Sequence, residues 1–220
     1  MSTPLPHITL DSGTSPRHSI IWLHGLGADG GDFVSIAQQI NLPVAVRYLF
    51  PHAPMRPITI NGGMIMRAWY DIISFDGPID IAGIQTSQAA VENLIAGEKN
   101  RGIVAKNIYL AGFSQGGAIA LYTGLIHAEK LGGIIALSTR LPQNGNLPEQ
   151  KNTHKPPIFM AHGHNDSIIP YTAGIRSAAL LRENGYRLEW REYAMPHSVC
   201  EEEVGDIERW LTRELTNNST

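Results

Sequence analysis

Short apolar segments alternate with longer segments of helical periodicity along most of this chain, and the alternation limits the folds it can adopt. The apolar segments predict strands over residues 19–24, 44–50, 107–113, 133–138, 157–163 and 187–193. The helical spacing predicts helices over residues 32–40, 83–99, 115–129, 171–184 and 199–215, and the Pro- and Gly-rich residues 51–64 indicate a loop. Strands that alternate with helices form a mostly parallel sheet with helices on both faces, an α/β fold. Ligands of such folds bind beyond the carboxyl ends of the strands.

Length and charge predict a single domain over residues 1–220. The chain has 220 residues, 17% of them charged, a net charge of −3 and one cysteine, Cys200. A slightly acidic chain does not favour binding to nucleic acid. A single cysteine permits no disulfide within the chain, and no signal peptide or apolar run of about 20 residues is present. We therefore expect a cytoplasmic protein without stable insertion into a membrane.

The glycine-rich segment WLHGLGADGG, residues 22–31, fits two kinds of site. Gly25, Gly27 and Gly30 match G-x-G-x-x-G, the fingerprint of dinucleotide-binding oxidoreductases. That fingerprint requires an acidic residue about 20 residues later, and no Asp or Glu occurs between Asp32 and Asp71. The other interpretation is a loop whose backbone N–H groups bind an oxyanion, which favours a hydrolase.

A nucleophile is predicted in GFSQGG, residues 112–117. Gly112, Ser114 and Gly116 form G-x-S-x-G after an apolar strand and before an Ala/Gly-rich helix. This context indicates a nucleophile elbow, a sharp turn that exposes the serine hydroxyl. The N–H of Gln115 would lie at the helix N-terminus and stabilise an oxyanion, together with an N–H from the glycine loop, for which Leu26 is the candidate. The alternative is a tight connection with an idle serine.

A serine nucleophile needs a base and an acid that orients it. In this fold they follow the serine in the order acid, then histidine. Asp166 follows the strand at 157–163, and His197 follows the strand at 187–193, just before the last helix. Both candidates therefore belong to the same edge of the sheet as Ser114.

A metal site is the alternative use of this region. His162, His164 and Asp166 form H-x-H-x-D, but Ser167 stands where metallo-hydrolases continue with histidine. The remaining ligands would have to come from elsewhere in the chain. We therefore favour the serine mechanism and expect no metal.

These motifs in this order resemble the acyl-protein thioesterase and lysophospholipase-like carboxylesterases, and small bacterial carboxylesterases above all. The resemblance rests on LHGLGADG, FPHAP, NGGM, AWYDI, AGFSQGG, ALSTRLP, HGHND and PHSVCEEE, from about residue 20 onward. It implies an α/β-hydrolase fold, a triad of Ser114, Asp166 and His197, and oxyanion donors at the N–H groups of Leu26 and Gln115. It further implies hydrolysis of carboxylic esters or thioesters without cofactor or metal. The substrates implied are small esters, lysophospholipids and other lipid esters, or acylated proteins.

The sequence indicates the walls of the substrate pocket less clearly than the triad. Trp69, Leu141 and Ile169, with Leu26, are candidates for apolar walls, although such residues also build cores. Arg140 lies in a segment that, by resemblance, borders the acyl groove, where relatives often carry an uncharged residue. Its charge would limit a long acyl chain or attract an anion, unless the side chain extends into water. The sequence leaves open the acyl length and whether the protein is a homodimer.

Overall fold

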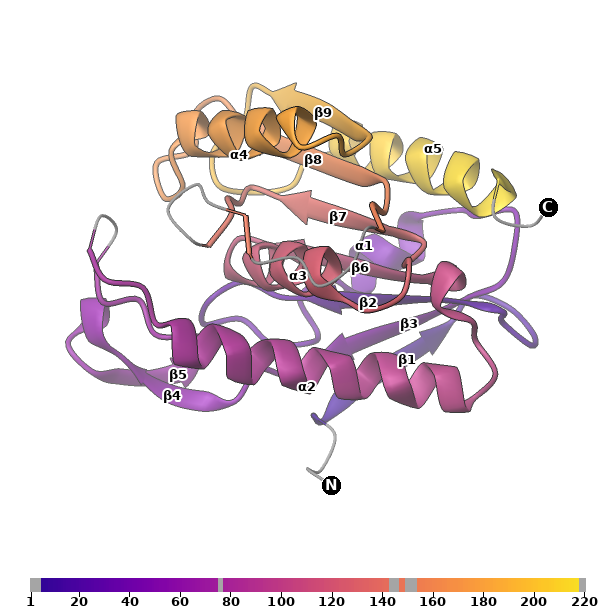
Figure 1. Cartoon of the computed structure of the whole chain (residues 1–220), viewed down its shortest axis with the longest axis horizontal. Helices are drawn as coiled ribbons and strands as arrows, with labels where there is room; N and C mark the ends of the chain where they lie inside the picture. Colours follow the sequence, from indigo (N-terminus) through magenta and orange to yellow (C-terminus); the bar gives the residue numbers. More distant parts are fainter. Residues whose placement is uncertain (1–4, 75–76, 143–146, 149–153, 218–220) are drawn as a thin grey trace.

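The computed structural model describes residues 5–74, 77–142, 147–148 and 154–217. Its centre is a seven-stranded sheet in the order β1-β3-β2-β6-β7-β8-β9 (Figure 1). Only β1 is antiparallel to its neighbour, and all other neighbouring strands are parallel. The strands are β1 (His7–Asp11), β2 (His18–Leu23), β3 (Val46–Pro51), β6 (Ile108–Phe113), β7 (Gly133–Leu137), β8 (Ile158–Gly163) and β9 (Leu188–Tyr193).

Helices cover both faces of the sheet, as predicted. In Figure 1, α2, α3 and α4 lie in front of the sheet, and they share one apolar core with it. Residues of α1 and α5 belong to a second core on the opposite face. The helices are α1 (Val34–Gln39), α2 (Ile81–Asn100), α3 (Gln115–Ile126), α4 (Tyr171–Glu183) and α5 (Glu201–Asn217). Among the described residues, none of the helices is long and apolar enough to cross a bilayer.

Strand β2 shows why the apolar runs are continuous rather than alternating. Every residue of this strand is buried. Ile21 and Leu23 pack in the core on one face, while Ile20 and Trp22 pack in the core on the other. A strand covered on both faces favours apolar side chains at successive positions, here from Ile20 to Leu23.

The structure differs from the sequence prediction at two places near the first strands. Strand β1 was not predicted, because a short edge strand with alternating exposed residues gives little apolar signal. Residues 51–64 were predicted as a loop, but they lie largely in a hairpin of β4 (Met55–Ile58) and β5 (Met64–Arg67), with η1 (Thr59–Asn61) between them. A second 3-10 turn, η2 (Ala105–Asn107), precedes β6. The long polar loop between β7 and β8 falls partly outside the described residues.

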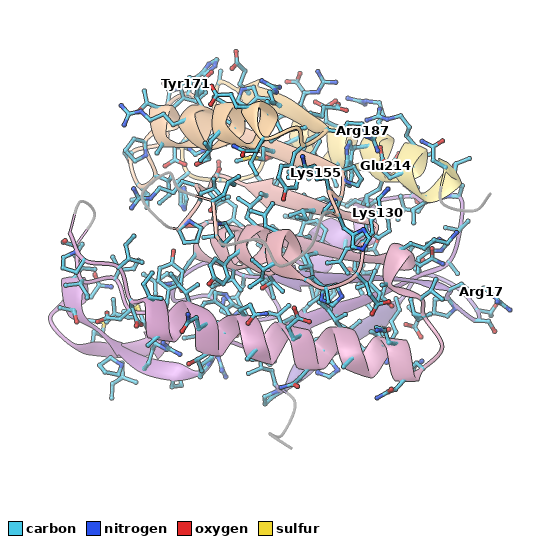
Figure 2. All side chains as sticks on the ribbon, viewed as in Figure 1. Arg17, Lys130, Lys155, Tyr171, Arg187 and Glu214 are labelled. Carbon is cyan, nitrogen blue, oxygen red and sulfur yellow. The ribbon has the colours of Figure 1, made fainter. Side chains whose placement is uncertain are left out.

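Two glutamates on the buried face of α5 lie in contrasting surroundings. Glu214 accepts two hydrogen bonds from the guanidinium of Arg187, at 2.9 and 2.5 Å, and Figure 2 shows the two side chains side by side. Glu203 is fully buried, and neither of its carboxylate oxygens has a hydrogen-bond partner among the described residues. Burial raises the pKa of Glu203 to about 8, and the nearby negative charge of Asp206 adds to the effect.

Candidate active site

Ser114 stands at a strained turn between β6 and α3. Its backbone angles, φ 53° and ψ −118°, lie in a region that side chains rarely adopt. The turn is packed tightly: a Cβ on Gly116 would lie 2.4 Å from the carbonyl oxygen of Leu23. Thr139 Oγ1 donates a 2.7 Å hydrogen bond to the carbonyl of Ser114, and the Ser114 N–H donates to Leu137. The surrounding structure therefore holds the serine in the conformation of a nucleophile elbow.

Asp166 and His197 come from the loops that follow β8 and β9. His197 Nδ1 lies 2.7 Å from Asp166 Oδ2, while Asp166 Oδ1 accepts hydrogen bonds from the N–H groups of Ile168 and Ile169 at 2.9 and 2.8 Å. A carboxylate accepts only, so Nδ1 of His197 carries the hydrogen and Nε2 is the acceptor. The Asp166 side chain is fully buried and that of His197 is 17% exposed. His197 and Ser114 line the same cavity.

The glycine loop leads from β2 to the cavity, and His24 holds its first residues. His24 Nε2 accepts a hydrogen bond from the Ala53 N–H at 3.0 Å, so Nδ1 is the atom that donates to the Gly25 carbonyl at 2.7 Å. This pattern requires a neutral ring, and burial lowers the pKa of His24 accordingly. Leu26, the next residue, lines the cavity together with Gln115.

The same loop is unsuited to a pyrophosphate. The N–H of Gly27 donates to the Arg67 carbonyl at 2.9 Å, and the N–H of Gly30 donates to His52 Nδ1 at 3.0 Å. Helix α1 begins only at Val34. Two N–H groups of the G-x-G-x-x-G segment are thus bound within the protein, and the segment does not open directly into a helix, as the dinucleotide fingerprint requires.

The cavity has a volume of about 420 Å³ and is lined mainly by apolar side chains. Its apolar and aromatic lining residues include Ile60, Tyr70, Ile72, Ile73, Pro78, Ile79, Phe113, Pro142, Ile168 and Ile169. Asp32, Asp71 and Arg140 add charges to the lining. Burial raises the pKa of Tyr70 to about 12, and the charge of Arg140 opposes that rise. Such a cavity suits an apolar group attached to a polar reacting centre.

Only one of the three weaker pocket candidates lines this cavity. Ile169 does, whereas Trp69 and Leu141 are buried in the core and are absent from the lining. The indole Nε1 of Trp69 donates to the His24 carbonyl at 2.8 Å, and the Leu141 N–H donates to Ser177 Oγ at 3.0 Å. A continuous part of the wall comes instead from residues 70–74 and 78–79, which no motif in the sequence indicated as lining residues. Their one signal was their position directly after Trp69.

The Gln115 side chain joins that wall to the nucleophile turn. Its Oε1 accepts from the Trp69 N–H and its Nε2 donates to the Tyr70 carbonyl, both at 2.7 Å. The Ser87 hydroxyl also binds the Trp69 carbonyl. Gln115 therefore fixes the start of the wall relative to Ser114.

The H-x-H-x-D segment does not assemble as a ligand set. His162 is completely buried and lies 3.3 Å from Asp166, whereas the His164 side chain is 45% exposed and lies 3.4 Å from Glu192. Within the described ranges, no three His, Cys, Asp or Glu side chains are grouped so that they could hold a metal ion.

The chain is similar to known proteins over nearly its whole length. Residues 7–215 match the family model described as phospholipase/carboxylesterase. The chain is 42% identical to acyl-protein thioesterase 1 of Neurospora crassa over 216 residues, which cover 90% of this chain and 88% of that protein. It is 34% identical to acyl-protein thioesterase 1 of Cryptococcus neoformans over 238 residues, covering 98% of this chain and all of that protein.

Two solved plant structures share the architecture. The crystal structure of SOBER1 from Arabidopsis thaliana superposes with a TM-score of 0.82 at 32% identity, over 90% of this chain and 99% of that one. The crystal structure of acyl-protein thioesterase 2 from Zea mays superposes with a TM-score of 0.80 at 27% identity, over 94% and 99% of the two chains.

Proposed function

Because this chain belongs to the phospholipase/carboxylesterase family, and is therefore a serine hydrolase of esters and thioesters, we propose that Ser114, Asp166 and His197 form its catalytic triad. One observation carries the proposal. A serine in a strained turn and a histidine hydrogen-bonded to a buried carboxylate line one cavity. The order of the three residues along the chain is the order that this fold requires.

The reaction starts with proton transfer from Ser114 Oγ to His197 Nε2 as the oxygen attacks the acyl carbon. The carbonyl oxygen gains the negative charge, and the N–H groups of Leu26 and Gln115 stabilise it. Asp166 keeps its charge and stabilises the imidazolium that forms. His197 then gives the proton to the leaving alcohol or thiol, and the acyl group remains on Ser114.

Water completes the cycle in the second half-reaction. His197 accepts a proton from water, which attacks the acyl-enzyme, and then returns the proton to Ser114 as the carboxylic acid leaves. All steps are proton transfers and acyl transfers among Ser114, His197, water and the substrate. The expectation that the reaction needs no metal or cofactor follows from this chemistry.

The apolar side chains among residues 70–74 and 78–79 give the acyl chain its site. We propose that the substrates are lipid esters or acylated proteins whose acyl chain lies along Ile72, Ile73 and Ile79, with Arg140 at the rim. Acyl-protein thioesterases among the relatives support this substrate class. A single domain and a cytoplasmic location remain predictions.

The triad is tested with a fluorophosphonate probe and an ester assay on Ser114→Ala. We expect loss of labelling and a fall in kcat on the order of 10⁴ or more, with unchanged circular dichroism. Ser35→Ala is the control, since Ser35 is exposed on α1 and does not line the cavity, and it should label like the wild type. Full labelling of Ser114→Ala would refute the assignment.

The substrate class is tested by hydrolysis of oxygen esters and thioesters over a series of acyl lengths. We expect kcat/KM to rise with each added methylene until the cavity is filled, by up to about tenfold per step. A rate that is highest for acetyl esters and falls from there would contradict the acyl site along residues 70–74 and 78–79.

A further inference from the structure

We propose that His162 is a positioning residue that holds Asp166 and the adjoining cavity wall in place. It is completely buried near the end of β8. The idea rests on the proposed triad and adds a residue to it. His162 neither lines the cavity nor reaches Ser114, so any role must act through Asp166 or through the turn that follows it.

The His162 ring holds the turn at residues 166–169 through two atoms. Nε2 lies 2.8 Å from the Ile169 carbonyl oxygen and 3.3 Å from Asp166 Oδ2. The N–H of Ile169 in turn donates to Asp166 Oδ1 at 2.8 Å. One ring nitrogen thus contacts the carboxylate directly and also holds the peptide segment whose N–H groups bind the other carboxylate oxygen.

The protonation state of His162 follows from these partners. Both are acceptors, so Nε2 carries the hydrogen, and Nδ1 has no hydrogen-bond partner among the residues that the structure describes. A second proton would have to be buried at Nδ1, where a Cβ on Gly174 of α4 would already lie 2.6 Å away. Burial lowers the pKa of His162 in agreement with this. His162 is therefore a neutral donor.

The other groups that face His162 leave this conclusion unchanged. Asp166 and His197 approach from the loops after β8 and β9, and their charges have opposite effects on the ring. Tyr171 packs edge-on from α4, at the labelled end of that helix in Figure 2, and Trp190 of β9 stacks on the ring at 6.3 Å between centroids. Glu192, on the same strand, is bound to Tyr171 and Trp190 instead.

A neutral donor behind the carboxylate has two effects on the triad. The His162 N–H partly neutralises the negative charge on Asp166 Oδ2, the oxygen that also binds His197. Asp166 therefore stabilises the His197 imidazolium less strongly. His162 also fixes Ile168 and Ile169, which line the substrate cavity. His162 therefore sets both the strength of the base and the position of one cavity wall.

The test compares His162→Phe, which removes the Nε2 hydrogen but keeps a ring, with His162→Gln, whose amide restores an N–H donor. We expect His162→Phe to lower kcat/KM about 10- to 100-fold. The acidic limb of its pH–rate profile should move to higher pH by about half a unit, because Asp166 then stabilises the imidazolium more strongly. His162→Gln should recover most of the rate and the wild-type limb. His18→Phe is the control, since His18 is also buried but lies at the start of β2, at the opposite end of the strands.

Three outcomes separate this proposal from the assignment of the triad. An acidic limb at or below the wild-type position in His162→Phe, or no recovery in His162→Gln, would overturn the role of His162 while Ser114→Ala and Asp166→Asn stay inactive. Retained activity in Ser114→Ala and Asp166→Asn would instead overturn the triad itself. A shifted limb in His162→Phe that is absent from His18→Phe supports the proposal, because lost folding stability alone does not move it.

Discussion

Replacing Glu203 with glutamine should stabilise the folded protein, and the gain should grow as the pH rises. Glu203 is fully buried in the first turn of α5, and its pKa rises from the ordinary 4.5 to about 8. At a pH between these two pKa values, Glu203 keeps its proton in the folded protein but has released it in the unfolded chain. Rising pH therefore favours unfolding over that range, and the loss of stability levels off above about pH 9.

The size of the effect follows from the difference between the two pKa values. Each unit of difference corresponds to about 1.4 kcal/mol, so the wild type should lose about 2.5 kcal/mol between pH 5 and pH 7 through this group. The full loss, reached above about pH 9, is about 5 kcal/mol. Glutamine has nearly the shape of the protonated acid and does not titrate, so the amide side chain of the variant avoids this loss.

Urea unfolding at a series of pH values measures the difference directly. The matched control is Glu202→Gln, because Glu202 is the preceding residue of the same helix and is exposed. We expect the free energy of unfolding of Glu203→Gln to exceed that of the wild type by an amount that grows with pH, and that of Glu202→Gln to show no such trend. A constant difference across the series, or a gain confined to acidic pH, would refute the reasoning.

Three further predictions concern the site and its support. A methyl group on Gly116 would meet the Leu23 carbonyl at 2.4 Å, so Gly116→Ala should lower the free energy of unfolding in urea by about 1–3 kcal/mol or more. Gly97→Ala, on an open face of α2, should raise it by up to about 1 kcal/mol. Equal effects of the two substitutions would contradict the close packing of the turn at Ser114. Asp166→Asn should keep its thermal midpoint within a few degrees and lose about 10⁴-fold in kcat, and a loss under tenfold would show that another group orients the base. Arg140→Met should raise the ratio of long-chain to short-chain ester hydrolysis about tenfold, and an unchanged ratio would place Arg140 outside the acyl path.

The parallel part of the fold could be predicted because strands buried on both faces are continuously apolar. The helices and the central strands appear where periodicity and composition predict them, within a few residues. The hairpin of β4 and β5 could not be found in this way. It lies outside the main sheet and is mostly exposed, so burial does not require a continuous apolar run in its sequence. It also contains Pro57 and the Gly62–Gly63 pair, which are typical of a loop.

The site was predictable where one short motif determines one position, as at Ser114, whose elbow geometry is present in the structure. The wall of the cavity was not, because side-chain direction decides which apolar residues face it. Trp69 and Tyr70 are neighbours, yet only Tyr70 lines the cavity. The role proposed for His162 depends on two distances that no spacing in the sequence reveals.

The hydrogen bonds that Gln115 accepts from Trp69 and donates to Tyr70 have a consequence for how such an enzyme diversifies. They fix the start of the apolar wall beside Ser114, while Ile72, Ile73 and Ile79 lie farther along the chain, beyond that attachment. Substitutions at these outer positions change the shape offered to the acyl chain without moving the reacting groups. Substrate range can therefore change during evolution through substitutions in this part of the wall, while the reacting groups and their chemistry stay the same.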